Sequence, residues 1–293
     1  MTERRVASAT GGIWRADGRI VKVLRPDRPA NPYWPAGLRL EEPMWWRREA
    51  DAYESGLLPR GALRAARCEA VVERDDGSVA LVLEDLRGLP ATEWPLERYG
   101  PAARELGRWQ GSFRTVPREP WLSHDWLRAY LARRAEECAH EPLWADRELL
   151  LGALDRVPRT LCHLDLWPRN LSDEDGATVA IDWAFVGIGA VGEDAGNLVP
   201  DSVFDGFLAP ERIDELHDLV WTEYLAGLRD SGWPGEERDA RLGFCVGAAL
   251  KYVWVRPRVA ARGPLQGGPE AAATCLALLD RLADEARGLA SAS

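Results

Sequence analysis

Lysine is scarce in this chain. Of its 37 basic residues only Lys22 and Lys251 are lysine, and the others are arginine. The sequence also lacks an apolar run long enough to span a bilayer, and its first residues, Met1 to Arg5, lack the hydrophobic stretch of a signal peptide. We therefore expect a cytoplasmic protein with no membrane partner.

Cysteine is present without any pattern that would give it a role. The five cysteines are scattered and none forms a Cys-x-x-Cys pair, which predicts buried thiols and excludes a disulfide or zinc framework. The formal net charge of −10 disfavours nucleic acid as a partner, because the phosphate backbone would be repelled. It is compatible with a cationic small molecule, although an acidic surface also serves solubility alone.

The most informative segment runs from Cys162 to Trp183 and reads CHLDLWPRNLSDEDGATVAIDW. Within it, residues 173–176 are a turn signal, and the β-branched run 178–181 predicts a short strand after the turn. A hairpin of this kind would make Asn170 and Asp182 face each other. Asp165 lies just upstream of the hairpin and His163 two residues before it.

These residue types suit phosphoryl transfer. Two oxygen ligands at adjacent strand ends suit Mg²⁺, which takes few protein groups and completes its shell with phosphate oxygens and water. Asp165 could accept a proton from an attacking hydroxyl. A pattern this short can also arise by chance in a loop between two buried strands, but four such residue types beside a well-placed hairpin favour a functional site.

The spacing resembles the catalytic loop and metal-binding Asp of protein kinases. It is more similar still to the aminoglycoside phosphotransferase family, which usually reads His-Gly-Asp followed later by Ile-Asp-Trp or Ile-Asp-Phe. Residues 181–183, Ile-Asp-Trp, match directly, whereas Leu164 and Arg169 stand where the family usually has Gly. The resemblance implies an α+β, protein kinase-like bilobal fold, with a small N-terminal antiparallel β-sheet lobe and a larger, mainly helical C-terminal lobe.

Lys22 lies in the alternating segment 19–24, a predicted strand. Its ammonium is a compact point charge, and the resemblance implies that it contacts nucleotide phosphates. The family fold holds this lysine with a carboxylate from the next helix. We predict that helix over 42–54 and favour Glu49, within Arg48-Glu49-Ala50, as the partner. The alternatives are Glu41, Glu42 and Glu54, or a helix face that is merely charged.

Further nucleotide contacts follow from the resemblance. Gly11 and Gly12 would form a turn between the first two strands, where backbone amides can approach phosphate closely. The apolar run 79–83 predicts a strand that leads into Glu84 and Leu86, which correspond to the hinge whose backbone binds a purine. We therefore expect a nucleotide-binding lobe over residues 1–87 and a catalytic and substrate-binding lobe over 88–293.

Beyond the hinge the apolar periodicity predicts helices over 99–113, 126–134, 149–154, 213–228, 239–252 and 270–289. Asp194 corresponds to a family Asp that braces the catalytic loop, and we interpret it as structural. His163 is interpreted as a brace of the same loop.

The resemblance implies a Mg²⁺-dependent O-phosphotransferase that moves the γ-phosphoryl group of ATP or GTP to a hydroxyl of a small molecule. Asp165 would be the base, Asn170 and Asp182 the metal ligands, and Lys22, steadied by Glu49, the phosphate contact. An aminoglycoside or another antibiotic is the favoured acceptor, with resistance or self-resistance as the role. The alternatives are a metabolic kinase of an amino alcohol, sugar or nucleoside, and a pseudokinase that binds nucleotide without catalysis. The choice of ATP or GTP and the oligomeric state stay open.

Overall fold

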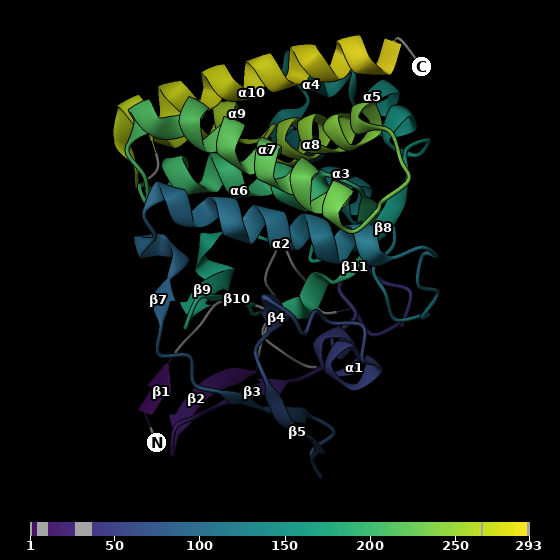
Figure 1. Ribbon diagram of the computed structural model, residues 1–293, viewed down its shortest axis with the longest axis vertical. Helices are drawn as coiled ribbons and strands as arrows, with labels where there is room; N and C mark the ends of the chain where they lie inside the picture. The colour runs from purple at the N-terminus through teal and green to yellow at the C-terminus, as the bar shows by residue number, and fades with distance from the viewer. Residues whose placement is uncertain (1, 5–10, 27–36, 265, 292–293) are drawn as a thin grey trace.

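A computed structural model describes residues 2–4, 11–26, 37–264 and 266–291. A β-sheet built from the N-terminal part of the chain lies at one end of the molecule, and a stack of helices lies at the other (Figure 1). The predicted α+β fold, with a small antiparallel sheet and a larger helical part, is confirmed.

The N-terminal sheet has five antiparallel strands in the order β1-β2-β3-β6-β5. Their bounds are β1 Thr2–Arg4, β2 Gly12–Ala16, β3 Arg19–Leu24, β5 Cys68–Glu73 and β6 Val79–Glu84. Asp17 and Gly18 both have positive φ, which forms the tight turn between β2 and β3. Strand β3 is central and coincides with the predicted segment, so Lys22 lies between Ile13 of β2 and Leu81 of β6.

Helix α1 spans Arg48–Ser55 and begins later than predicted. The expected helix over 42–54 is wrong at its start, because the residues before Arg48 form turns and not a helix. The guanidinium of Arg48 donates to the carbonyl oxygens of Glu42, at 2.7 Å, and Pro43, at 2.5 Å. These two carbonyl oxygens therefore accept hydrogen bonds from a buried side chain. In a helix they would instead accept from the backbone amides four residues further along the chain. The helix ends at Gly56, whose φ is 78°.

A second sheet connects the two parts of the chain. Its order is β4 (Leu63–Ala65), β10 (Ala177–Ala180), β9 (Leu171–Glu174) and β7 (Leu89–Pro90). Strand β4 pairs in parallel with β10, so a segment from the proposed residues 1–87 joins the sheet of the later part. The proposed boundary at Arg87 falls between β6 and β7, where the chain passes from the first sheet to the second. Strand β8 (Arg159–Cys162) pairs antiparallel with β11 (Gly187–Ala190).

The predicted helices all form. They are α2 Tyr99–Ser112, α3 Trp126–Cys138, α5 Arg147–Leu154, α7 Ile213–Asp230, α8 Glu237–Lys251 and α10 Gly268–Ser291. The apolar periodicity did not predict α4 (Pro142–Ala145), α6 (Glu193–Phe204) or α9 (Val255–Arg262). Short 3-10 turns are η1 Ala91–Glu93, η2 Leu96–Arg98, η3 Pro168–Asn170, η4 Trp183–Phe185 and η5 Pro210–Arg212.

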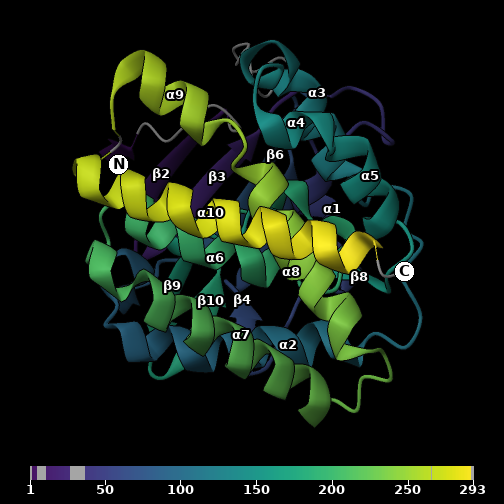
Figure 2. The ribbon, with the colours of Figure 1, turned by 90° about the horizontal axis from the view of Figure 1, so that it is seen from above.

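The helices pack closely, and glycine permits the closest approach. Helices α2 and α7 lie side by side, while α10 crosses over α6 and α8 (Figure 2). A Cβ added at Gly107 would lie 2.2 Å from the carbonyl oxygen of Tyr224, and one at Gly227 would lie 2.0 Å from that of Arg104. The two backbones could not meet with larger residues at these positions. None of the helices in the described part of the chain is both long and apolar enough to cross a bilayer.

Candidate active site

The loop from His163 to Asn170, called the 163–170 loop below, follows strand β8 and begins on a buried histidine. The His163 side chain is fully buried, and its Nε2 lies 2.9 Å from the carbonyl oxygen of Ile181. The backbone N–H of Asp165 donates to His163 Nδ1 at 3.3 Å. Burial lowers the pKa of His163 to about 4, so the ring is neutral near pH 7. It ties the loop to the end of strand β10, as expected of a brace.

Leu164 has a left-handed backbone, with a φ of 65°. A glycine, which the family usually has here, adopts this conformation without strain, whereas a leucine does so at a cost. The Leu164 side chain is 1 % exposed and its N–H donates to Asp194 Oδ1 at 2.8 Å. Core packing and this hydrogen bond therefore hold the unusual residue in place.

Asp194 anchors the loop from helix α6. Its Oδ2 accepts hydrogen bonds from the N–H of His163 at 2.7 Å and from Nε2 of Gln110 at 2.9 Å. Gln110 is held in turn by the hydroxyl of Tyr224, which donates to Gln110 Oε1 at 2.6 Å. The structural interpretation of Asp194 agrees with these contacts. Sequence analysis did not find Gln110 or Tyr224, which lie on α2 and α7, far along the chain from the loop.

Asp165 is partly buried, with 29 % of its side chain exposed. The amide nitrogen of Asn170 donates to its backbone oxygen at 2.9 Å and to its Oδ2 at 3.3 Å. Burial raises the pKa of the Asp165 carboxyl above its usual value, against the opposing effect of the Lys251 ammonium. A carboxylate with a raised pKa is a stronger base than a carboxylate with the usual pKa.

The predicted hairpin brings Asn170 and Asp182 to adjacent strand ends. Asn170 ends η3 just before β9, and the N–H of Ile181 donates to its carbonyl oxygen at 2.9 Å. Asp182 follows directly, in a left-handed conformation with a φ of 63° and a side chain that is 38 % exposed. The turn between β9 and β10 is formed by Asp175 and Gly176, both with positive φ.

Lys22 reaches the same place from strand β3. Its Nζ lies 2.5 Å from Glu49 Oε2 and 2.8 Å from Asp182 Oδ1. Lys22 and Glu49 are 4 % and 1 % exposed. Burial opposes the charged form of Lys22, but the carboxylates of Asp182 and Glu49 outweigh it and raise the pKa of the lysine. The ammonium therefore joins the N-terminal sheet, α1 and the hairpin.

Among the carboxylates considered for this partnership, Glu49 is the one that contacts Lys22. Glu42 is occupied by Arg39 and by the N–H of Leu38, and Glu54 contacts Arg47. The fully buried Arg48 beside Glu49 donates to the carbonyl oxygens of Trp121, at 2.7 Å, and Ala184, at 3.4 Å. It fixes α1 against the segment that follows Asp182, a role that sequence analysis did not assign.

The glycines pair with strand β3 beside Lys22, and the hinge residues lie at and beyond the end of strand β6. The N–H of Gly11 donates to the carbonyl oxygen of Val23 at 2.7 Å, and Gly12, with a φ of 146°, begins β2 and pairs with Val23. The turn expected between the first two strands otherwise lies outside the described residues. Glu84 ends β6, and its carboxylate contacts Arg64 and the N–H of Arg67. Leu86 follows β6 and is partly buried.

Lys251, the other lysine, is also at this site. It ends helix α8, is 7 % exposed, and its Nζ lies 3.7 Å from Asp165 Oδ1. Lysine is rare in this arginine-rich chain, and that rarity was the only feature of the sequence that set Lys251 apart. Helix α8 lies far from the loop along the chain, so no local spacing relates the two.

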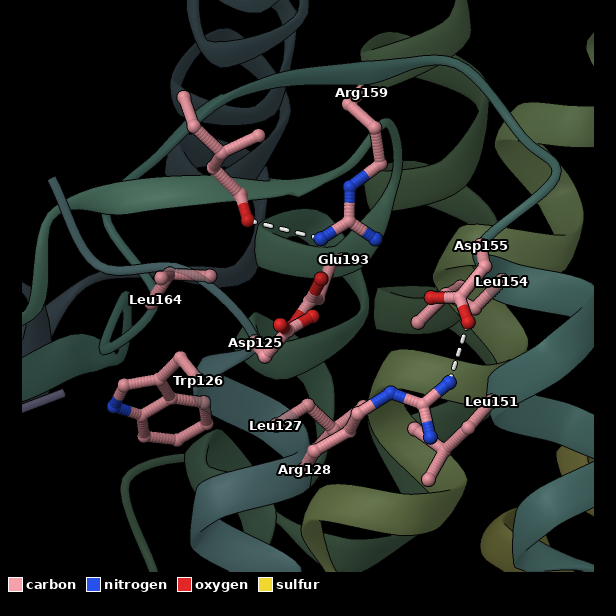
Figure 3. A pocket seen from close by; sticks show the side chains of 11 residues that line it. Asp125, Trp126, Leu127, Arg128, Leu151, Leu154, Asp155, Arg159, Leu164 and Glu193 are labelled. Carbon is pink, nitrogen blue, oxygen red and sulfur yellow. Dashed lines mark hydrogen bonds and ion pairs between the residues drawn. The ribbon is translucent and has the colours of Figure 1, made fainter. Parts of the chain in front are cut away.

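The space behind the loop is closely filled. A cavity of about 20 Å³ lies between Leu164, Trp126 and Glu193, with Arg159 and Arg128 at its side (Figure 3). This volume is enough for about one water molecule, so it is not an acceptor site. Within the described residues, no three His, Cys, Asp or Glu side chains cluster as metal ligands. A cation at Asn170 and Asp182 would therefore need further ligands from phosphate and water.

Several solved kinase structures are similar to this chain in overall fold. A choline/ethanolamine kinase family protein from Mesorhizobium loti is 15% identical, with a TM-score of 0.58 over 100% of this chain and 93% of that one. An amicoumacin kinase, solved with AMP-PNP, Ca²⁺ and its ligand, is 15% identical, with a TM-score of 0.57 over 98% and 88%. Aminoglycoside 2′-phosphotransferase-IIIa in complex with GDP is 12% identical, with a TM-score of 0.55 over 96% and 92%.

Compared by sequence with curated proteins, the chain matches none of them. A family model does match, over residues 22–230, and it describes the phosphotransferase enzyme family. The matched region begins at Lys22 and includes Glu49 and the whole hairpin with Asp165, Asn170 and Asp182. The resemblance first indicated by that hairpin is thereby confirmed, and the chain belongs to the phosphotransferase enzyme family.

Proposed function

We propose that the protein is a Mg²⁺-dependent O-phosphotransferase that moves the γ-phosphoryl group of ATP or GTP to a hydroxyl of a cationic small molecule. One observation carries this proposal. The buried Lys22, 2.5 Å from Glu49 and 2.8 Å from Asp182, brings a cation from the sheet to the end of the hairpin that also bears Asn170. This arrangement supports the proposal that Lys22 contacts phosphate and that Asn170 and Asp182 are the two oxygen ligands.

Each residue then has a role that its surroundings support. Asp165 accepts the proton of the acceptor hydroxyl and orients it, and its raised pKa suits a base. Asn170 uses its amide nitrogen on Asp165, which leaves the amide oxygen for a cation. Bound Mg²⁺ would neutralise charge on the phosphate oxygens. Lys22 contributes a point charge toward the phosphates, oriented by Glu49. His163 holds the loop and takes no part in proton transfer.

The backbone of Gly11 and Gly12 and the hinge at Glu84 and Leu86 are proposed as the other nucleotide contacts. Gly12 pairs with Val23, the residue that follows Lys22 on strand β3. The Glu84 carboxylate is occupied by Arg64 and the Arg67 N–H, and the Glu84 N–H donates to the carbonyl oxygen of Arg67 at 3.0 Å, so only its backbone carbonyl oxygen is proposed to meet the base.

For the acceptor we favour an aminoglycoside or another antibiotic, which would make resistance or self-resistance the role. Support comes from the structural likeness to an amicoumacin kinase and to an aminoglycoside 2′-phosphotransferase. The net charge of −10 suits an acceptor that carries amino groups. A second candidate is an amino alcohol, favoured by the likeness to a choline/ethanolamine kinase family protein.

The test is to incubate the purified protein with Mg²⁺, ATP or GTP, and a panel of aminoglycosides, other antibiotics and amino alcohols. Mass spectrometry then detects a product heavier by one phosphoryl group. Asp165→Ala should lower turnover by roughly 10²-fold or more, because it removes the base while leaving nucleotide binding nearly intact. A product that persists at the wild-type rate in Asp165→Ala would refute the assignment of the base. Nucleotide binding with no product from any acceptor would refute the proposed acceptor classes.

A further inference from the structure

The side chains around Lys251 do not explain why its ammonium is buried. Its ammonium is buried, and no oxygen in the described part of the chain accepts a hydrogen bond from it. Its Nζ lies 3.7 Å from Asp165 Oδ1, and 5.6 Å and 5.7 Å from the ring centres of Trp126 and Tyr252. An ammonium has three N–H donors, and burying them without acceptors costs free energy.

Neutralising the charge of the other buried acids near α8 does not account for the burial of Lys251. The acids that feel its charge, besides Asp165, are Glu193, Asp194 and Asp201, and each accepts a hydrogen bond from another group. Glu193 accepts from the Ala190 N–H at 3.0 Å. Asp194 accepts from the 163–170 loop, and Asp201 from the hydroxyl of Tyr252. Asp165 is the acid whose ion pair with Lys251 the structure shows, with Oδ1 3.7 Å from Nζ.

We infer that the Lys251 ammonium contacts the terminal phosphate of the bound nucleotide and follows the phosphoryl group as it moves to the acceptor oxygen. The inference rests on the proposed function, in which Asp165 holds the acceptor hydroxyl. The transferred phosphorus must come within bonding distance of that hydroxyl, so its oxygens pass close to any donor beside Asp165 Oδ1. Lys251 lies there, whereas Lys22 is bound by Glu49 and Asp182 on the side of the N-terminal sheet.

A second cation at this point has a chemical purpose. Negative charge on the transferred group is spread over three oxygens in the transition state, and a positioned cation in a partly dry site stabilises it. The three rotatable N–H donors of an ammonium can stay in contact while the group moves, which a rigid guanidinium fork does less well. Before nucleotide binds, the same cation favours the charged form of Asp165 and so opposes the effect of burial on its pKa.

The scarcity of lysine makes a direct test practical. A γ-acyl-phosphate of ATP transfers its acyl group to an amine beside the terminal phosphate, forming an amide and releasing ATP. We expect tryptic mass spectrometry to find the acyl group on Lys251, in the presence of Mg²⁺, and excess unmodified ATP to suppress it. Labelling of Lys22 without Lys251 would overturn the inference and leave the proposed function standing. Failure to bind nucleotide at all would overturn both.

A second measurement separates contact with the phosphate from a structural role. Lys251→Met keeps the length and apolar stem of the side chain and removes its charge. We expect it to weaken AMP-PNP roughly tenfold while leaving ADP unchanged, because only AMP-PNP carries the terminal group. Lys251→Arg, which keeps a cation, should recover part of the difference. The inference would be overturned if Lys251→Met weakened the binding of both nucleotides equally, or of neither, because the ratio of the AMP-PNP and ADP affinities would then be unchanged.

Thermal unfolding completes the comparison. A lysine kept for function should not stabilise the fold, so Lys251→Met should melt at or above the wild-type temperature. A lysine that neutralised buried acids would give the opposite result. If Lys251→Met failed to fold, that result would itself favour the structural role, and the labelling of the wild-type chain and the AMP-PNP to ADP ratio of Lys251→Arg would still decide the inference.

Discussion

Leu164 offers a test in which the sign of the effect depends on backbone conformation alone. The residue has a φ of 65° and a side chain that is 1 % exposed. Replacing it with Ala or Gly removes the same packing apart from one methyl group, at a cost of about 2–5 kcal/mol for a buried leucine. The two variants differ in the backbone. Alanine keeps the left-handed strain of roughly 1–2 kcal/mol, and glycine relieves it.

Leu166 is the matched control, since it lies two residues away in the same loop, is 3 % exposed and does not have a positive φ. At Leu166 glycine should be less stable than alanine by roughly 0.5–1 kcal/mol, because glycine loses more backbone freedom on folding. At Leu164 the relief of strain should offset that loss. We therefore expect the glycine-minus-alanine difference at Leu164 to exceed that at Leu166 by about 1–2 kcal/mol in favour of glycine.

Urea unfolding of the four variants measures this difference, with a shared slope as the check that the unfolded states are alike. Equal glycine-minus-alanine differences at the two positions would refute the conclusion that the 163–170 loop is strained at Leu164. The result bears on function, because this backbone conformation sets the direction of the next residue, Asp165.

Two further predictions concern the buried ionisable groups. Glu49→Gln should lower the free energy of unfolding by about 3 kcal/mol and weaken nucleotide binding, because it leaves the Lys22 ammonium with one of its two carboxylates. Urea unfolding measures the first effect and a fluorescent-nucleotide titration the second. An unchanged free energy of unfolding would contradict the pairing of Glu49 with Lys22. His163 has a pKa of about 4 when folded, below its usual value near 6.5, so the unfolded chain binds a proton first as the pH falls. The stability that His163 contributes is full above pH 6.5 and declines by about 3 kcal/mol as the pH approaches 4. His163→Asn should lack this decline, and parallel stability curves for the two proteins would show that the histidine is not buried in its neutral form.

Local patterns in the sequence were sufficient for the parts of the site that are close along the chain. The turn at Asp175 and Gly176 is short, and its residues favour positive φ, so the pairing of Asn170 with the residues before Asp182 could be predicted. Strand β3 could also be predicted locally, from the turn at Asp17 and Gly18 before it, although its burial rises along the strand and does not alternate.

The parts that depend on distant contacts could not be predicted. The start of helix α1 depends on Arg48. Its guanidinium donates hydrogen bonds to the carbonyl oxygens of Trp121 and Ala184, which are far away in the sequence. Helix α6 contains Pro200, which argues against a helix in any local reading, but the helix is almost entirely buried between its neighbours. Gln110 and Lys251 reach the 163–170 loop from other helices, so no spacing in the sequence relates them to it.

The two carboxylates that contact Lys22 are not equivalent, although both lie within 2.8 Å of its nitrogen. The side chain of Glu49 is 1 % exposed and that of Asp182 is 38 % exposed. Only Asp182 is open to the space where phosphate and Mg²⁺ would lie. On nucleotide binding we therefore expect Lys22 to exchange Asp182 for a phosphate oxygen while it keeps Glu49. The position of Glu49 is fixed by the neighbouring Arg48, which binds the backbone of Ala184 just beyond Asp182. The buried pair then holds the lysine in place, and the exposed carboxylate becomes available to the metal without any rearrangement of the sheet or of helix α1.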